Sequence, residues 1–431
     1  CVAFGEKIRL LDGNLIEAEF LIGKTFKVIA FCPDEPMKFR PDTAQAHYNG
    51  IRDVIEITTD RGRVIRRTPE HPLWSDISPR RWDSNAYDTR LRPIGKWNKI
   101  SLLQKGSVVA VYSDNTVKQP VNNLEEEIKI LAYILGDGNT SSKVSRQLRI
   151  SQVEGKTLDE IKQCVKVFDC ELVHIKGVDY RIVGIKRRHN NLQTVADSWG
   201  VWGKTSFEKR FPDFVWLFDS HQLSLFLSRL YACDGWVYLG ESNKWKARHI
   251  GYATVSLGMA TDLLSALLRL GILGRLRKKK TTWTYKGKKK HGFAYVIEIC
   301  DVENLLRFCD GVGIFGKEEK ISLLRKSCVT ASVKEQQWWR HHGLPDNMRW
   351  EKVKSVCTVK NVSTVSISVP EKNTFVTDFV EHNTALASWA VLFGLATFGD
   401  DFKIITTASS WRQLTKFLWP EIHKWYRRTK W

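Results

Sequence analysis

A thiol at the start of the chain and a hydroxyl–imidazole pair further along it are the first candidates for chemistry. Cys1 carries the most nucleophilic ordinary side chain near neutral pH. If a peptide preceded Cys1, attack of the thiol on the preceding carbonyl would turn that amide into a thioester. Thr68 and His71, in the tetrapeptide TPEH, could polarise and protonate the same peptide bond. These three residues could therefore activate a peptide bond without hydrolysing it.

A second group, His382, Asn383 and Thr384, lies near the end of the β-rich part of the sequence. An Asn side chain can attack its own backbone carbonyl, which forms a succinimide and cuts the chain after the Asn. His382 could protonate or polarise that carbonyl, and the hydroxyl of Thr384 could act as a nucleophile. The triplet is a candidate site for cutting and rejoining the chain.

Two carboxylates form a third group. Asp137 and Asp234 each precede a glycine and each end a segment of helical periodicity. If the two helices pack side by side, the carboxylates meet at their ends, and paired carboxylates hold hard divalent cations such as Mg²⁺. A single Asp-Gly is a common helix-ending turn, but two equivalent copies favour a metal site.

The elements that must position the first two groups are β-strands. Short alternating segments at 24–31, 53–68 and 106–113 predict strands, with a hairpin turn at Asp60-Arg61-Gly62. They place a β-rich domain over residues 1–115. The β pattern returns over 350–383, which is too short for a domain of its own. We expect this part to complete the first β domain, which the residues between interrupt.

Helical periodicity and a repeated design mark residues 120–335. Asn123 is the expected N-cap of the first helix, with Glu126 at the capping-box position, and Ser220 is the expected N-cap of the second. The apolar stripes of the two helices contain Ile128, Leu131, Ala132, Leu135, Leu223, Phe226, Leu227 and Leu230. Strands and a further helix follow each Asp, so we predict an internal duplication of one α/β unit.

The net charge of +20 points to a polyanionic partner, most simply DNA. The basic segment 276–292, turning at Lys286-Gly287, is a candidate hairpin, and 181–191 is its expected counterpart. Basic side chains on a β-ribbon can read a major groove and contact phosphates; the alternative is a solvated charged hairpin. The candidate DNA contacts are Arg181, Lys186, Arg187, Arg188, Arg277, Lys278, Lys279, Lys280, Lys286, Lys288 and Lys289.

Cysteine usage and hydropathy indicate a compartment. Nine cysteines are scattered without a C-x-x-C pair, which argues against a disulfide framework or a structural zinc site and for a reducing cytosol. No apolar run is long enough to span a membrane, and no signal peptide precedes the β-rich part. We therefore expect a cytoplasmic monomer with no membrane partner.

The reactive residues at the two edges of the β domain resemble the splicing motifs of an intein. Cys1, the T-x-x-H of Thr68 and His71, and the segment VSTVSISVPEKNTFVTDFVEHN carry the resemblance. It implies four steps: a Cys1 thioester, transfer of the acyl group to Thr384, cyclisation of Asn383 assisted by His382, and rearrangement to a peptide bond. No cofactor is needed. Ser366 stands where the family often has an Asp, which leaves the tuning of the thiol and ester steps open.

The resemblance also implies a splicing partner before Cys1, the N-extein. No peptide precedes Cys1 here, so we expect the chain as written to cleave itself at most after Asn383. A hedgehog-like autoprocessing domain forms the same thioester and is an alternative. The Asn383-Thr384 pair argues against it, because that reaction needs no Asn at the end of the domain.

The duplicated helices resemble the two LAGLIDADG motifs of homing endonucleases. LAYILGDGN and LYACDGWV match well at the Asp-Gly end, and Gly136 and Ala232 could let the helices pack closely. The resemblance implies double-stranded DNA as the partner, Mg²⁺ bound by Asp137 and Asp234, and cleavage of one strand by each Asp. It also implies that Lys209, in KRFPDF, lies near the scissile phosphate; the alternative is a solvated surface lysine. A DNA-binding regulator that keeps this fold without cleaving is the alternative.

Residues 384–431 resemble the start of a phage terminase large subunit, just after its P-loop, through TTASSWRQLTKFLWPEIHKW. The resemblance implies a short α/β P-loop NTPase fragment in which Thr384 would also bind Mg²⁺. It implies a bacterial or phage-infected host cell. The expected fold is thus multidomain: an all-β splicing (Hint) domain interrupted by an α+β LAGLIDADG domain with pseudo-two-fold symmetry, followed by this fragment.

Overall fold

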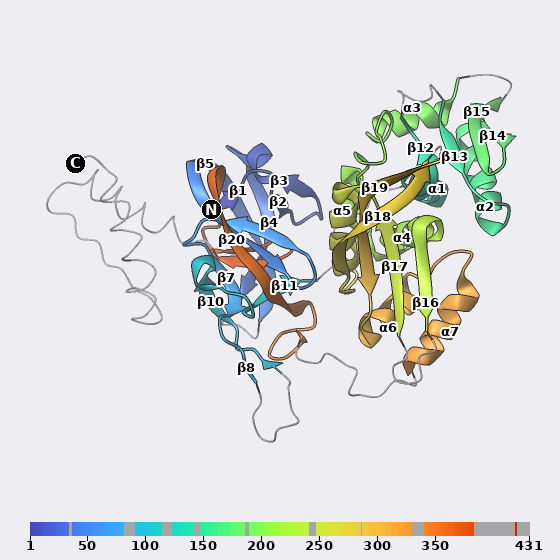
Figure 1. Ribbon diagram of the computed structural model, residues 1–431. Helices are drawn as coiled ribbons and strands as arrows, with labels where there is room; N and C mark the ends of the chain where they lie inside the picture. Colours follow the sequence, from blue (N-terminus) through green and yellow to red (C-terminus); the bar gives the residue numbers. More distant parts are fainter. Residues whose placement is uncertain are drawn as a thin grey trace.

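Two bodies make up the part of the chain that the structure, a computed structural model, describes (Figure 1). The described residues are 1–33, 37–81, 91–113, 123–141, 147–185, 189–240, 247–285, 287–329, 340–382 and Trp419. One body, here called the β body, is built from both ends of this part of the chain. The other, the α/β body, is built from residues 123–329. The tail that resembles a terminase lies outside the described residues except for Trp419.

The β body consists of strands and short 3-10 turns. Its elements are β1 (Val2–Ala3), β2 (Lys7–Arg9), β3 (Leu15–Glu17), η1 (Ala18–Leu21), β4 (Thr25–Cys32), β5 (Lys38–Thr59), β6 (Val64–Arg67), β7 (Pro72–Asp76), β8 (Arg80–Arg81), β9 (Leu91–Arg92), β10 (Lys96–Lys99), η2 (Ile100–Leu102), β11 (Val108–Tyr112), β20 (Met348–Ser368), β21 (Thr374–Val376) and β22 (Val380–His382). The main sheet runs β21-β22-β7-β11-β20-β1-β6-β5-β4, with β10 beside β7. Strands from the two ends of the sequence therefore share one sheet, in which β20 lies between β11 and β1.

The predicted strands are confirmed. The segment 53–68 forms the end of β5 and all of β6, which pair across the turn with Ile57 opposite Ile65. The returning β pattern forms β20, which pairs with β5 and β11, and then β21 and β22. The C-terminal segment thus completes the sheet of the N-terminal one, because β20 pairs with β11 and with β5 and is mostly buried towards both of its ends.

The α/β body repeats one unit. The first copy comprises α1 (Glu125–Asp137), β12 (Gly138–Asn139), β13 (Arg149–Ser151), α2 (Lys156–Cys164), η3 (Val165–Phe168), β14 (Cys170–Lys176), β15 (Asp179–Gly184), α3 (Asn191–Ser198) and η5 (Asp213–Leu217). The second comprises α4 (Ser220–Asp234), β16 (Gly235–Leu239), β17 (Arg248–Thr254), α5 (Leu257–Arg269), β18 (Arg275–Tyr285), β19 (Lys288–Ile299), α6 (Val302–Gly311) and α7 (Glu318–Val329). The sheets run β12-β13-β15-β14 and β16-β17-β19-β18, the same order in each copy. The predicted duplication is confirmed.

Both predicted helix caps are wrong by one residue. Helix α1 is capped at Leu124, and Glu127 rather than Glu126 closes the capping box; the side chain of Asn123 donates to Glu127 instead. Helix α4 is capped by Asp219, one residue before Ser220. A carboxylate already at the cap satisfies the exposed backbone N–H groups, so Ser220 enters the first turn instead.

The expected partner of the basic hairpin also needs correction. Strands β18 and β19 form that hairpin, with Tyr285 opposite Lys288. Its equivalent in the first copy is β14–β15, which covers 170–184 rather than 181–191. The chain leaves β15 at Gly184 and enters α3 at Asn191, so the stretch 181–191 crosses a strand end.

Helices α1 and α4 pack against each other at their C-terminal ends (Figure 1). A Cβ on Gly136 would lie 2.5 Å from Sγ of Cys233, so only glycine allows this approach. The predicted role of Gly136 is thus confirmed, but it faces Cys233 rather than Ala232. The stripe residues of both helices are buried, and Ile130, Tyr133 and Ile134 of α1 are buried as well. Burial on nearly all sides fixes where the helix ends lie.

No described helix is long and apolar enough to cross a membrane.

Candidate functional sites

The nitrogen of Cys1 lies between the two residues of the T-x-x-H motif. Thr68 Oγ1 accepts a hydrogen bond from it at 2.7 Å, and His71 Nδ1 lies 3.3 Å away. The backbone N–H of Thr68 donates to the carbonyl of Cys1, and that of His71 donates to the carbonyl of Thr68. Strand β1 holds this geometry by pairing Val2 with Arg67, directly before the motif. The structure therefore brings together the three predicted residues at this end.

Glu381 controls which nitrogen of His71 carries a proton. His71 Nε2 lies 2.9 Å from a carboxylate oxygen of Glu381, and both side chains are buried. Burial opposes ionisation, but the Arg67 guanidinium holds the pKa of Glu381 well below its ordinary value. Nε2 must then donate to the carboxylate, which leaves the lone pair of Nδ1 facing the nitrogen of Cys1.

His71 is neutral in this setting. Burial and, next, the positive amino group of Cys1 lower the pKa of His71 to about 4, against the opposing effect of Glu381. In a chain with a peptide before Cys1 the nitrogen is an uncharged amide, so this second contribution is absent. The pKa of His71 then lies higher, nearer the range in which an imidazole transfers protons.

A buried ion-pair network holds Glu381. Arg67 donates to both of its carboxylate oxygens at 2.5 and 2.7 Å and to Glu6 at 2.9 Å, and Thr377 Oγ1 donates at 2.6 Å. The side chains of Arg67 and Glu381 are 1% and 0% exposed, so these hydrogen bonds hold the carboxylate against His71 without competition from solvent. The sequence analysis missed both residues, although each stands directly beside a predicted one.

His382 is the last described residue of the predicted triplet. It lies on β22, opposite Thr374, with its ring 5.0 Å from that of Trp97. Burial and the nearby His71 lower the pKa of His382 to about 4, so it is neutral as well. Strand β22 pairs with β7, which begins directly after His71. The two ends of the β-rich sequence thus meet, while Asn383 and Thr384 lie outside the described residues.

Asn49 supplies a contact to the thiol that the sequence analysis did not anticipate. Its side-chain amide donates to Sγ of Cys1 at 2.6 Å. Ser366, the departure from the family pattern, lies on β20 opposite His47 and next to Val365, which pairs with Val2.

Asp137 and Asp234 meet at the ends of α1 and α4. Burial and the charge of Asp234 raise the pKa of Asp137 to about 6, and burial raises the pKa of Asp234. Gln152 on the loop after β13 donates to Asp137 at 2.9 Å. The structure brings together the two predicted carboxylates, and their mutual repulsion favours a bound cation.

Two lysines mirror each other beside these carboxylates. Lys209 Nζ donates to the carbonyls of Ile134, Leu135 and Gly138 at 2.7–3.0 Å, at the end of α1. Lys317 Nζ donates to the carbonyls of Ala232 and Gly235 at the end of α4. Burial lowers the pKa of Lys209 to about 8 and also lowers that of Lys317. Lys209 is thus buried rather than a solvated surface lysine.

Lys317 was missed by the sequence analysis, although a signal for it existed. Lys209 closes the tripeptide FEK and Lys317 closes FGK. Comparison of the two copies downstream of each Asp would have paired these tripeptides. The duplication therefore extends from the carboxylates to the cations that cap their helices.

The donor set suits a hard divalent cation that also has water or phosphate ligands. No cluster of three or more His, Cys, Asp or Glu able to hold a metal occurs among the described residues. The two carboxylates are hard oxygen donors, and Mg²⁺ keeps several waters and substrate phosphates in its shell. The residues present therefore fit a cation that a nucleic-acid phosphate helps to bind.

The outward face of the first sheet carries the predicted Arg181. It lies on β15 opposite Arg149 of β13, and it donates to Gln147 at 3.3 Å. Arg149 was not predicted, although paired residues on antiparallel strands share a face. Lys186, Arg187 and Arg188 lie outside the described residues. Two adjacent guanidinium groups on an open sheet face are suited to phosphate contacts.

The basic run on β18 is exposed but divides between two faces. Arg277 and Lys279 alternate with Lys278 and Lys280, so only half of them can face one surface. Arg277 also pairs with Glu298 at 3.2 Å, and Lys278 lies 4.3 Å above the ring of Phe293. Lys289 is exposed on β19, and its neighbour Lys288 pairs with Tyr285. Lys286 lies outside the described residues.

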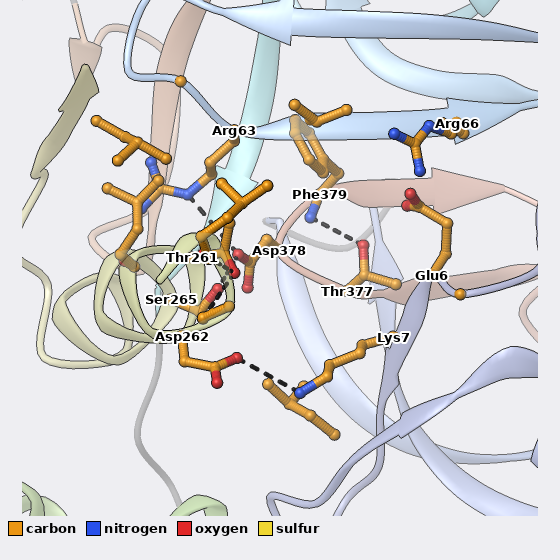
Figure 2. A pocket seen from close by; sticks show the side chains of 18 of the residues that line it. Glu6, Lys7, Arg63, Arg66, Thr261, Asp262, Ser265, Thr377, Asp378 and Phe379 are labelled. Atoms are coloured by element: carbon orange, nitrogen blue, oxygen red, sulfur yellow. Dashed lines mark hydrogen bonds and ion pairs between the residues drawn. The ribbon is translucent and has the colours of Figure 1, made fainter. Parts of the chain in front are cut away.

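The two bodies are joined around a cavity of about 480 Å³ (Figure 2). Asp378, next to Thr377 of the Glu381 network, accepts a hydrogen bond from Ser265 of α5 at 2.7 Å. Lys7 of the β body pairs across the cavity with Asp262 of α5 at 3.5 Å. Thr377, whose hydroxyl donates to Glu381, itself lines the cavity on the side of the β body.

Residues 221–313 match the family model of the LAGLIDADG-like domain. The matched stretch begins one residue into α4 and runs through the second sheet into the loop after α6. It therefore contains Asp234 and the whole basic hairpin, and stops just before Lys317.

Similarity to known proteins extends over most of the chain. The replicative DNA helicase DnaB of Rhodothermus marinus is 26% identical over 333 residues, 75% of this chain and 33% of the helicase. The replication factor C small subunit of Methanocaldococcus jannaschii is 27% identical over 68% of this chain and 14% of that protein. The chain thus spans a third or less of the length of these relatives. A solved structure, the Ssp DnaB mini-intein variant M86, covers 26% of this chain and 63% of its own, with 18% identity and a TM-score of 0.20.

Proposed function

We propose that this chain is an intein that excises itself from a host protein and carries, inserted in its splicing domain, a homing endonuclease that cleaves double-stranded DNA. The observation that carries the splicing proposal is the arrangement around His71: Cys1 and Thr68 meet at its Nδ1 side, buried Glu381 lies at Nε2, and His382 is close enough for His71 to lower its pKa. Similar segments within a helicase and a replication factor of different lengths support it, because an intein is a segment that different hosts can carry.

At the N-terminal junction, the thiol of Cys1 attacks the carbonyl of the preceding residue. The carbon–sulfur bond forms, the carbon–nitrogen bond breaks, and the thiol proton ends on the released nitrogen. Thr68 Oγ1 and His71 Nδ1 lie against that nitrogen. His71 can take the proton at Nδ1 and return it to the nitrogen, because Glu381 keeps Nε2 protonated throughout.

At the C-terminal junction, Thr384 would accept the acyl group and Asn383 would then cyclise. His382 lies in a buried site with a pKa of about 4, so it enters this step as a neutral imidazole. A neutral ring can accept a proton from the attacking carboxamide or donate through its other nitrogen to the carbonyl. The ester between the two flanks then rearranges to an amide without further catalysis.

In the α/β body, the two carboxylates and two lysines are proposed to hydrolyse phosphodiester bonds. When bound at Asp137 and Asp234, a divalent cation, Mg²⁺ by preference, would activate water and stabilise the leaving oxygen. Lys209 and Lys317 place positive charge beside the carboxylates, where phosphate charge builds up during cleavage. Arg149, Arg181 and the β18–β19 hairpin would contact the duplex.

The identity of the host is a finer proposal. Residues 384–431 would be the start of a terminase large subunit, in which Thr384 regains a Mg²⁺-binding role after splicing. The N-extein would supply the rest of the P-loop. We propose the cytoplasm of a bacterial or phage-infected cell as the site of action, and a monomer as the acting species.

The splicing proposal is tested by expressing a precursor with a short tagged peptide before Cys1, beside an Asn383→Ala control. We expect the ligated flanks and a free element from the wild type, and neither from the control. An intact precursor in both samples would contradict the proposal.

The nuclease proposal is tested by incubating the chain with a library of randomised DNA duplexes and Mg²⁺, and by sequencing the cleaved ends. Enrichment of one cut site would support a homing endonuclease and reveal its overhang. Sequence-selective binding without cleavage would instead support the non-cleaving regulator.

A further inference from the structure

Strand pairing is irregular beside Cys1. Two residues of β5, Asn49 and Gly50, oppose the single Thr364 of β20, so the strand carries a β-bulge. Gly50 has a φ of +76°, in the left-handed region that favours glycine. The Thr364 hydroxyl lies 3.4 and 3.0 Å from the two carbonyls of the bulge. Bulges next to reactive sites commonly redirect one side chain, which here is that of Asn49.

The carboxamide of Asn49 is held in one orientation. Its Nδ2 donates to Sγ of Cys1 at 2.6 Å, while its Oδ1 accepts from Arg52 at 3.3 Å. Arg52 also donates to the backbone carbonyl of Asn49 at 3.1 Å and lies 3.9 Å from Glu70, inside the T-x-x-H motif. Because the guanidinium can only donate, the carboxamide oxygen must face Arg52 and its N–H must face the sulfur.

We infer that Asn49 is a positioning residue for the first splicing step, aiming the thiol of Cys1 and stabilising negative charge on its sulfur during attack. This inference rests on the proposed splicing function and deepens it. The thiol loses its proton as the carbon–sulfur bond forms, and the charge-assisted N–H contact from Asn49 favours that charge. Arg52 contacts both Asn49 and Glu70, which lies inside the T-x-x-H motif. The groups that contact the sulfur and the nitrogen of Cys1 are therefore connected through Arg52.

Two substitutions separate this role from a purely structural one. Asn49→Ala removes the donor. Asn49→Asp keeps the shape and the acceptor for Arg52, but it replaces the donor with a negative charge beside the sulfur. A structural role predicts that Asp rescues the rate, whereas the proposed role predicts that Asp is slower than Ala at neutral pH.

The experiment follows release of the peptide before Cys1 by hydroxylamine, in an Asn383→Ala precursor that stops after the first steps. We expect Asn49→Ala to slow release about tenfold, as the loss of one hydrogen bond to a charged group does. Its rate profile between about pH 6 and about pH 9 should also move to higher pH, because the thiolate has lost a stabilising donor.

The hydroxylamine experiment has two controls. Gln45→Ala, an exposed position on the same strand whose side chain contacts Thr25 at 3.3 Å, should release at the parent rate. Cleavage after Asn383 in a Cys1→Ala precursor should be equally fast with and without Asn49→Ala. Release from Asn49→Ala at the parent rate, or rescue by Asp, would overturn the inference while leaving the splicing proposal intact. A parent precursor that releases nothing would overturn both.

Discussion

Burial favours the uncharged form of the side chains in both the splicing centre and the carboxylate centre, so it shifts the pKa values of histidines and aspartates in opposite directions. In the β body, burial keeps His71 and His382 neutral, with pKa values of about 4. In the α/β body, burial and mutual repulsion raise the pKa of Asp137 to about 6. The first centre must move a proton between uncharged groups, while the second must release a proton when a cation binds, because a bound cation favours the ionised carboxylates. One physical effect therefore prepares two kinds of chemistry.

The two centres also differ in how they are assembled. The carboxylate centre comes from two copies of one unit, each with a helix ending in Asp and a lysine capping that helix. The splicing centre is instead assembled from two segments that do not resemble each other. Its Arg67 and Glu381 come from opposite ends of the described chain and meet only in the folded sheet. DNA cleavage by the carboxylate centre should therefore fall when the packing of α1 against α4 is disturbed. The reaction at the splicing centre should fall when the ion pair between Arg67 and Glu381 is broken.

The largest effect is expected from Asp137→Asn. It removes one carboxylate from the cation site, and we expect DNA cleavage to fall by about a thousandfold, the size associated with losing an electrostatic contact at a reaction centre. Splicing should continue at the parent rate. Asp310→Asn, on an exposed ion pair with Arg325, is the matched control. Equal cleavage by the Asp137→Asn variant and the parent protein would show that the carboxylates do not serve catalysis.

Glu381→Gln should come next. It leaves the buried Arg67 without its main counter-charge, and we expect a loss of about 3–5 kcal/mol in the free energy of unfolding of the β body. It also releases His71 Nε2 from the carboxylate, so N-terminal cleavage should slow while DNA cleavage persists. Denaturant unfolding measures the first effect. Glu56→Gln, which breaks the more exposed pair with Arg66, should cost less than about 1 kcal/mol; equal losses would contradict the buried-network account.

Gly136→Ala tests the helix contact of the carboxylate centre. The added methyl group would overlap Cys233, so we expect a loss of about 1–3 kcal/mol in the stability of the α/β body, with weakened DNA cleavage. Combining it with Cys233→Gly should restore part of the loss, because the added methyl group would lie 2.5 Å from Sγ and 2.6 Å from Cβ of Cys233. Gly311→Ala, with nothing within 4 Å of the added Cβ, is the control. Additive losses in the double variant would contradict the close contact.

The smallest expected effect is that the stabilities of the two bodies change in opposite directions as the pH falls. Both buried histidines have folded pKa values of about 4 and ordinary values of 6.5, so the unfolded chain binds protons that the folded chain does not. Their contribution to stability is present above pH 6.5 and is lost as the pH falls towards 4, by about 1–2 kcal/mol per histidine at about pH 5.

Asp137 behaves in the opposite way. Its folded pKa is about 6 against an ordinary 3.8, so its contribution is present at low pH and is lost as the pH rises through 6. Hydrogen exchange in EDTA at about pH 7 and about pH 5, corrected for intrinsic rates, should show protection falling in the β body only. His47→Gln, at an exposed position, should leave this pattern unchanged. Parallel loss in both bodies would contradict the opposite shifts.

Local patterns in the sequence were sufficient to predict most helices and strands. They also identified the reactive residues at the two edges of the β domain and the two aspartates at the helix ends. The strands around Asp60 and the helices ending at Asp137 and Asp234 follow from periodicity and turn residues within a short window. Helix starts were less predictable, because Asp219 and Ser220 are both good caps and only the folded geometry decides between them. Comparison of the two copies beyond their aspartates would also have revealed Lys317, because FGK is the counterpart of FEK.

The contacts that tune the splicing centre could not be predicted in this way. Glu381 reaches His71 because β22 pairs with β7, and Asn49 reaches Cys1 because a bulge interrupts β5. Each depends on the register of strands far apart in the sequence. A one-residue change in register would turn these side chains to the opposite face, and no local pattern encodes that register.

The most direct test of the account is the intact mass of the element released from a precursor with a peptide before Cys1. Splicing through Asn383 predicts ligated flanks together with an element of residues 1–383 that ends in a succinimide, one water lighter than an element ending in Asn. Release of an element with an ordinary Asn terminus from the first time point, without ligated flanks, would show hydrolysis instead. That result would contradict the central claim that the arrangement of Cys1, His71, Glu381 and His382 joins the flanks.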